Sequence, residues 1–107
     1  MKRFGSVIRV RPDKLEEYRA LHASVWPGVL ATIQRCNIRN YSIYYKDGYL
    51  FSYFEYIGEN YEWDMETMAA DPGTQQWWNL CKPCQEPLTT RAPDEWWANM
   101  VELFHQD

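Results

Sequence analysis

The amino-acid sequence predicts an α+β domain of the split βαβ, ferredoxin-like kind, in which helices cover one face of an antiparallel sheet. Strand-like and helix-like segments follow one another in the order β, α, β, β, α, β. The chain has 107 residues, which suits one domain and not two. Its hydrophobic content of 46% and aromatic content of 17% exclude a disordered chain. We therefore expect residues 1–107 to form a single domain.

The first strand and the start of the first helix carry short local signals. Residues 4–10 are short, β-branched and bounded by Pro12, as in a strand. Asp13 is a candidate helix cap, because Glu16 follows three residues later in the spacing of a capping box. We therefore expect a helix that begins at Asp13.

Apolar and aromatic side chains recur at helical spacing after this start. One face of the first helix is predicted to carry Leu15, Tyr18, His22 and Val25. Pro27 is typical of the first turn of a helix, so a second helical stretch is expected from Pro27 to about Arg35.

Residues 38–57 give the clearest signal, a hairpin with aromatic and β-branched strands. Asp47-Gly48 is a strong two-residue turn. On one face it pairs Tyr45 with Leu50, Ile43 with Ser52 and Tyr41 with Phe54; on the other it pairs Tyr44 with Phe51 and Ser42 with Tyr53. A half-solvated sheet would have one polar face, but here both faces carry large aromatic side chains. We infer that helices cover one face and a partner subunit covers the other.

The C-terminal half is predicted to hold two helices, a proline-rich arm and a last strand. The helix at residues 60–70 is acidic and amphipathic, with Tyr61, Met65, Met68 and Ala69 on one side. Asp71-Pro72 ends it and caps the next helix. Residues 82–97 form a loop or arm without periodicity, and residues 100–105 are a candidate last strand.

Charge and composition exclude several classes of function. The formal net charge is -4 and no dense Lys/Arg run exists, which argues against a nucleic-acid partner. No apolar run approaches the ~20 residues of a membrane span. Arg9 and Arg11 interrupt the apolar N-terminus too early for a signal peptide. Three cysteines are an odd number for a disulfide framework, so we expect a soluble cytoplasmic protein.

Three side chains with proton-transfer chemistry are predicted to converge. Tyr18 and His22 are four residues apart on one helix face and point toward the sheet. Tyr41 lies near the start of the second strand, and it meets them if its face is the covered one. A core histidine bonded to a core tyrosine explains the same pattern. The alternative is a pocket with two phenols and one group that titrates near neutrality.

Two tryptophan pairs have similar alternatives. Trp77 and Trp78 point about 100° apart on a helix, so one is expected in the core and the other in a groove or interface. A tryptophan beside a pocket suits a flat, partly apolar ligand such as a sugar. Trp96 and Trp97 lie near the end of the arm, where we favour a subunit contact over a pocket lid.

Cys81-Lys82-Pro83-Cys84 has the spacing of a redox or metal motif, but its context argues against both. The pair follows a helix, whereas a thioredoxin-type site opens one. A structural zinc site needs four ligands, and the sequence has no second C-x-x-C or H-x-x-x-H motif. Cys36 is expected to be a small apolar filler. Phosphate-binding and dinucleotide-binding glycine motifs are absent as well.

Together these segments resemble the L-rhamnose mutarotase family over nearly the whole chain. The resemblance rests on the combination Glu17-Tyr18-x-x-x-His22-x-x-x-Trp26-Pro27, Asn40-Tyr41-x-Ile43-Tyr44 and Trp77-Trp78. It implies a ferredoxin-like domain that dimerises through its sheet as a dimeric α+β barrel. It further implies that His22 is the proton donor, that Tyr18 and Tyr41 contact a monosaccharide, and that Trp77 and Trp78 form its aromatic wall. Residues 81–97 depart from the best-known rhamnose enzymes, so the sugar is expected to be L-rhamnose, L-fucose or another 6-deoxyhexose.

Mutarotation would require only a few proton-transfer groups in such a site. The anomeric hydroxyl loses a proton, the ring oxygen gains one, and these roles reverse on closure, so no cofactor or metal is required. A histidine with a pKa near 6.5 can serve either way. Two other hypotheses stay open at this stage. One is a cofactor-free oxygenase of the dimeric α+β barrel kind, and the other is a non-catalytic sugar-binding module.

Overall fold

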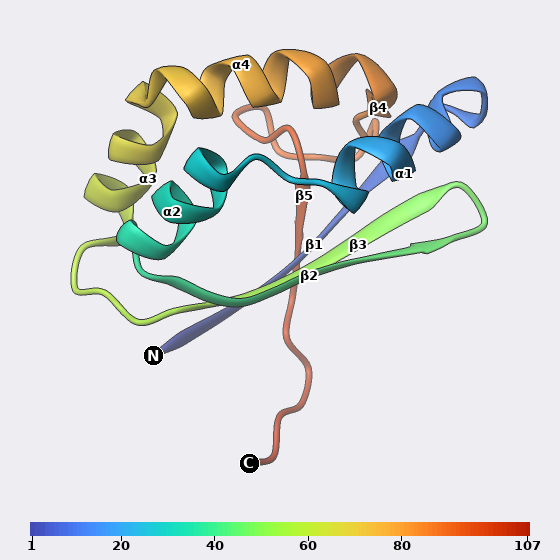
Figure 1. The fold of residues 1–107 in the computed structure, drawn as a ribbon. Helices are drawn as coiled ribbons and strands as arrows, with labels where there is room; N and C mark the ends of the chain where they lie inside the picture. Colours follow the sequence, from blue (N-terminus) through green and yellow to red (C-terminus); the bar gives the residue numbers. More distant parts are fainter.

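A computed structural model describes all of residues 1–107 as one twisted sheet with four helices on one of its faces (Figure 1). The strands are β1 (Lys2–Val10), β2 (Ile38–Lys46), β3 (Tyr49–Tyr56), β4 (Gln85–Glu86) and β5 (Ala98–Met100). The helices are α1 (Leu15–Ala23), α2 (Pro27–Arg35), α3 (Tyr61–Ala70) and α4 (Pro72–Cys81), with short 3-10 turns η1 (Pro12–Lys14) and η2 (Lys82–Cys84). None of the helices has the length and apolar character needed to cross a bilayer.

The sheet is antiparallel throughout, with the strand order β2-β3-β1-β4. Strand β5 also pairs with β1, opposite Gly5, Ser6 and Val7, while β4 pairs with Arg9 and Val10. The two ends of the arm therefore lie along one edge of β1. The α+β class and the helix-covered sheet predicted from the sequence are confirmed.

The hairpin has the predicted turn and almost all of the predicted register. Asp47 and Gly48 adopt φ values of 50° and 86°, as a type I′ turn requires. The structure pairs Tyr45 with Leu50, Ile43 with Ser52, Tyr44 with Phe51 and Ser42 with Tyr53. These pairs confirm which side chains share a face.

The predicted pairing of Tyr41 with Phe54 is modified by a bulge. Arg39 pairs with Glu55 and Ser42 with Tyr53, so Asn40 and Tyr41 both lie opposite a single residue. Asn40 takes the left-handed conformation, with φ of 51°. The Tyr41 and Phe54 rings still meet, with centroids 5.6 Å apart.

The predicted cap at Asp13 is wrong. Pro12 opens the short turn η1, and α1 begins only at Leu15, with no side chain bonded to its first N–H groups. Proline fixes the backbone at the start of that turn, which displaces the helix start from Asp13. The cap at Asp71 is confirmed, since its carboxylate accepts from the Thr74 N–H at 2.9 Å.

The predicted last strand at residues 100–105 is also wrong, because β5 ends at Met100. Beyond it the chain leaves the sheet on the side opposite the helices (Figure 1). Arg3 holds Glu102 through a 2.8 Å ion pair. Val101, Leu103 and Phe104 are at least 80% exposed. The pairing with β1 ends at Met100, opposite Gly5, so this segment forms no ladder with β1.

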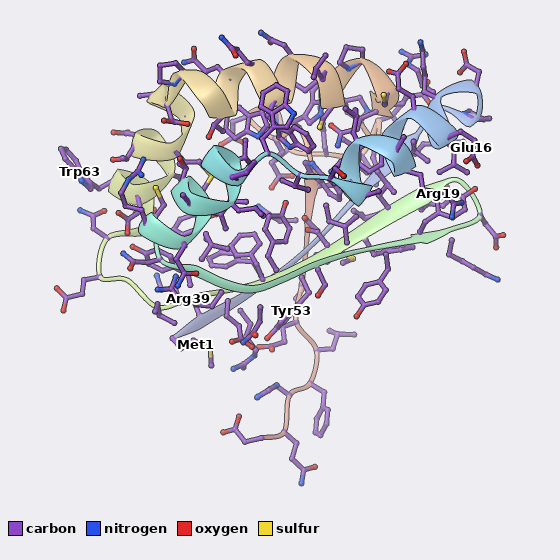
Figure 2. All side chains as sticks on the ribbon, in the orientation of Figure 1. Met1, Glu16, Arg19, Arg39, Tyr53 and Trp63 are labelled. Atoms are coloured by element: carbon purple, nitrogen blue, oxygen red, sulfur yellow. The ribbon has the colours of Figure 1, made fainter.

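The core lies between the sheet and the helices. Its buried members are Ile8, Val10, Tyr18, Val29, Leu50, Trp77, Cys81 and Cys84. Alternate residues of the same strands point to the opposite, uncovered face, where Tyr53 lies (Figure 2). Tyr44 on that outer face is 67% exposed. The predicted contrast between a helix-covered face and an aromatic face without cover within the chain is therefore present.

Candidate active site

A cavity of about 420 Å³ opens between the inner face of the sheet, α1, α3, α4 and the C-terminal arm. This volume lies near the lower end of the range of about 300–1,000 Å³ that is common for small-molecule sites. All five residues singled out from the sequence line it, namely Tyr18, His22, Tyr41, Trp77 and Trp78. No carboxylate lines this cavity. The predicted convergence of one histidine and two phenols is therefore present.

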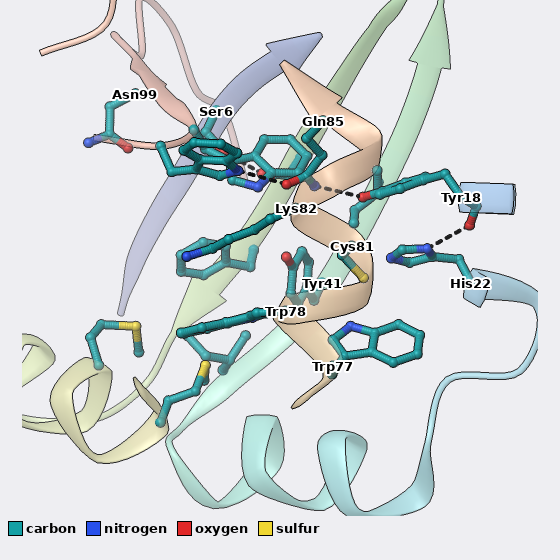
Figure 3. Close-up of a pocket in the computed structure, with 18 of the residues that line it drawn as sticks. Ser6, Tyr18, His22, Tyr41, Trp77, Trp78, Cys81, Lys82, Gln85 and Asn99 are labelled. Atoms are coloured by element: carbon teal, nitrogen blue, oxygen red, sulfur yellow. Dashed lines mark hydrogen bonds between the residues drawn. The ribbon is translucent and has the colours of Figure 1, made fainter. Parts of the chain in front are cut away.

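His22 is held in place by its own helix and by aromatic neighbours. Its ring stacks on Tyr18 with centroids 4.1 Å apart, and it meets the Trp77 ring in a T-shaped arrangement with centroids 5.3 Å apart. Its Nδ1 lies 2.9 Å from the Tyr18 carbonyl oxygen. A carbonyl can only accept, so Nδ1 carries the proton that is donated. Nε2 is then left facing the cavity, on the side of Cys81 and Tyr41 (Figure 3).

The surroundings of His22 favour its neutral form. Burial lowers the pKa of His22 below its ordinary value of 6.5, and the hydrogen bond to the Tyr18 carbonyl opposes this only in part. At neutral pH the ring is therefore uncharged. Its Nε2 lone pair is available to accept a proton from a bound molecule.

The two phenols stay protonated. Tyr18 is 4% exposed, and burial raises its pKa well above 10. Tyr41 is 44% exposed as a whole residue, but it lines the cavity, and burial raises its pKa to about 12. Both tyrosines are thus hydrogen-bond donors at neutral pH and poor bases.

The tryptophan pair divides as predicted. Trp77 is 6% exposed and packs edge-on against Trp26, with centroids 5.3 Å apart. Trp78 is half-buried and lines the cavity. The ammonium group of Lys82 lies 5.4 Å from the centre of the Trp78 ring and 5.7 Å from that of Trp96. This cation therefore sits between two indole faces at the cavity wall.

The arm adds wall residues that sequence reasoning missed. Lys82, Gln85 and Asn99 all line the cavity. Lys82 follows Trp78 by four residues, a spacing that could have revealed it. Gln85 and Asn99 lie outside any periodic segment and carry no such signal. Ser6 and Ser52, whose hydroxyls are bonded to each other, complete the polar wall.

Trp96 and Trp97 line the same cavity. The sequence favours a subunit contact for this pair, with a pocket lid as the lesser alternative. The structure places both in the pocket wall. A contact of this pair with a second subunit stays a prediction.

The C-x-x-C cysteines are buried free thiols. Burial raises the pKa of Cys81 to about 12 and that of Cys84 to about 11, so neither is a thiolate at neutral pH. The Cys84 thiol donates to the Glu17 carboxylate at 3.2 Å. No group of three or more His, Cys, Asp or Glu side chains is placed to hold a metal. Cys36 is buried in the core as expected.

The sequence compares with one well-defined family. The sequence model for L-rhamnose mutarotase matches residues 3–106. An L-rhamnose mutarotase of Oceanobacillus iheyensis is 33% identical, and one of Bacillus subtilis is 30% identical. Each of these comparisons covers 100% of both chains.

Solved structures confirm the fold. The L-rhamnose mutarotase of Formosa agariphila superposes with a TM-score of 0.76 at 16% identity, covering 100% of both chains. The tetracenomycin F2 cyclase of Streptomyces glaucescens superposes with a TM-score of 0.75 at 11% identity, covering 100% of this chain and 98% of its own. At such low identity these likenesses concern the fold alone. The match over residues 3–106 and the full-length relatives show that this chain belongs to the L-rhamnose mutarotase family.

Proposed function

We propose that this protein exchanges the α and β anomers of a 6-deoxyhexose, L-rhamnose or L-fucose, with His22 as its acid and base. The family places it among the isomerases that act on aldose anomers. One observation carries the assignment to this site: His22 presents an uncharged Nε2 to a cavity of monosaccharide scale. The oxygenase and binding-module hypotheses gain no comparable support.

The proposed mechanism needs one imidazole. Nε2 accepts the proton of the anomeric hydroxyl O1, and the resulting imidazolium returns a proton to the ring oxygen O5 as the C1–O5 bond breaks. O1 and O5 are both bonded to C1, so a single nitrogen can reach each in turn. The products are an aldehyde at C1 and a hydroxyl at C5. Rotation about C1–C2 and closure by the reverse steps give the other anomer, and no redox or metal step is involved.

The cavity offers polar groups to the hydroxyls of a deoxy sugar and apolar groups to its ring face and methyl group. The hydroxyls of Tyr18 and Tyr41 can donate to sugar oxygens, and the face of Trp78 offers a flat surface for the ring. Met65 and Met68 of α3 line the same cavity and offer an apolar seat for the C6 methyl group. Trp77 is buried and packs against the His22 ring, so we expect it to support the imidazole from the side away from the sugar.

We further propose that two copies associate through the outer face of the sheet. Phe51, Tyr53 and Tyr44 lie on that face, on β2 and β3, and no helix of the same chain covers them. Exposed apolar patches of this kind mark protein interfaces. We expect the reaction to take place in the cytoplasm, which fits the three free thiols.

The experiment that tests the function is magnetisation-transfer NMR on equilibrated sugars with and without the protein. We expect faster exchange between the α and β anomeric protons of L-rhamnose or L-fucose. L-Mannose, which keeps the 6-hydroxyl, is the matched control for the methyl seat and should be accelerated less. If neither deoxy sugar exchanges faster in the presence of the protein, the proposed function is wrong.

A further inference from the structure

A buried glutamine links the arm to the catalytic helix. The Gln85 side chain, 5% exposed, donates through Nε2 to the hydroxyl oxygen of Tyr18 at 3.3 Å (Figure 3). Its Oε1 accepts from the indole N–H of Trp96 at 2.8 Å. Gln85 is the one protein partner of the Tyr18 hydroxyl. The chain Trp96–Gln85–Tyr18 therefore runs along one wall of the cavity.

Trp96 decides which way round the amide lies. An indole N–H can only donate, so it requires the oxygen end of Gln85. The NH₂ end must then face Tyr18. A glutamine without such a partner could turn its oxygen to the tyrosine and accept from it. The indole therefore fixes the direction of both hydrogen bonds, from Trp96 to Gln85 and from Gln85 to Tyr18.

The direction of these hydrogen bonds leaves the hydroxyl hydrogen of Tyr18 free. The Tyr18 oxygen accepts from Gln85, and no acceptor of the protein takes its O–H hydrogen. We propose that Gln85, oriented by Trp96, is a positioning residue that keeps Tyr18 a hydrogen-bond donor toward the sugar. This inference rests on the proposed function and adds Gln85 and Trp96 to it.

A fixed hydrogen-bond donor at Tyr18 would assist the ring-opening step. Negative charge grows on the ring oxygen as the C1–O5 bond breaks, and a donor fixed in advance stabilises it. Burial holds the pKa of Tyr18 high, so the phenol donates a hydrogen bond without giving up its proton. His22 performs the proton transfer from the neighbouring side of the cavity.

The decisive variant is Gln85→Glu, which keeps the shape and reverses the bond. The introduced carboxylate accepts from both neighbours, so it draws the Tyr18 hydrogen away from the sugar. Loss of one fixed donor costs about 10²–10³ in an oxyanion hole. We expect a loss of about 10- to 100-fold in the exchange rate at pH 8. As the pH falls, the carboxyl takes up a proton that it can donate to Tyr18, so the variant's rate relative to wild type should recover.

Three further variants separate this account from a packing role. In a Tyr18→Phe background, Gln85→Glu should change the rate by less than about 2-fold. Gln85→Leu leaves the Tyr18 hydroxyl free to turn and should cost less than Gln85→Glu at pH 8. Trp96→Phe keeps an aromatic ring but removes the N–H that orients the amide, so it should cost a few-fold, and it remains informative if Gln85→Glu does not fold.

The outcomes are distinguishable. A pH-independent loss that persists in the Tyr18→Phe background would show that Gln85 serves packing only. A gain in rate on Gln85→Glu would mean that Tyr18 acts as an acceptor, and wild-type rates in Trp96→Phe would remove the orienting role; each overturns the inference while mutarotase activity stands. If wild type itself accelerates neither deoxy sugar, the proposed function fails and this inference with it.

Discussion

Both faces of the sheet carry tyrosines, but the tyrosines have different surroundings on the two faces. Tyr41 and Tyr44 lie three residues apart on β2, yet Tyr41 faces the cavity and Tyr44 faces outward with 67% exposure. Burial raises the pKa of Tyr41 to about 12. The elements that cover each face of the sheet, and not the residue type, decide whether a tyrosine of β2 lies in the site or on the surface.

The two histidines repeat this contrast. His22 lies between Tyr18 and Trp77 on the inner side, whereas His105 lies in the exposed C-terminal segment and bonds to Asp107 at 2.8 Å. Only His22 meets the cavity. Tyr44 and His105 do not line the cavity that Tyr41 and His22 share, which makes them internal controls for that cavity.

The largest expected effect is on His22. His22→Ala should fold normally and lose most of its anomer-exchange activity, by about 10²–10⁴-fold, because the positioned proton carrier is gone. Magnetisation transfer with the preferred deoxy sugar measures it. His105→Ala is the matched control and should keep the wild-type rate. Equal rates for wild type and His22→Ala would refute the assignment.

The outer face has its own prediction. Phe51→Lys places a charge where we propose that two sheets meet, and each dimer contains the change twice. Truncation of an aromatic interface anchor costs about 2 kcal/mol or more, so we expect dimerisation to weaken by roughly 10²–10³-fold. Sedimentation velocity measures this. Trp63→Lys, on the exposed side of α3 (Figure 2), is the control and should leave the oligomer unchanged.

A smaller effect sharpens the contrast within β2. Tyr41→Phe removes one donor to the sugar, which is worth about 1.5 kcal/mol, or roughly tenfold in rate. Tyr44→Phe removes the same atom from the outer face and should change nothing. Initial exchange rates at low sugar concentration compare the pair. Similar losses in both variants would contradict the placement of the site.

The smallest effect is on stability. The pKa of His22 is lowered in the folded protein, so the unfolded chain binds the proton more readily. The free energy of unfolding therefore falls as the pH drops below the unfolded value of about 6.5. His22→Gln should lose less stability than wild type between pH 7.5 and pH 5.5. Urea unfolding at both pH values measures the difference, and parallel losses would argue against a lowered pKa.

Local patterns predicted the hairpin and the meeting of the first three site residues. Asp47-Gly48 sets a turn by backbone geometry, and the two-residue period then fixes which side chains share a face. The four-residue spacing of Tyr18 and His22 places both on one helix face. These features depend on neighbours in the sequence, and they were predicted correctly.

Contacts between distant segments were not predictable in this way. Gln85 meets Tyr18 across 67 positions of the chain, and only the folded arm brings them together. Strand β5 ends at Met100 although β1 continues to Lys2, and the apolar run after Met100 does not reveal where the pairing stops. The helix start at Leu15 was missed because Pro12 opened a separate turn.

The most direct measurement is a crystal structure with L-rhamnose or L-fucose bound. We expect a pyranose in the inner cavity with O1 or O5 about 2.6–3.2 Å from the Nε2 atom of His22. The C6 methyl group should lie against Met65 and Met68. A sugar bound on the outer face, or one in the cavity with both oxygens beyond reach of His22, would contradict it.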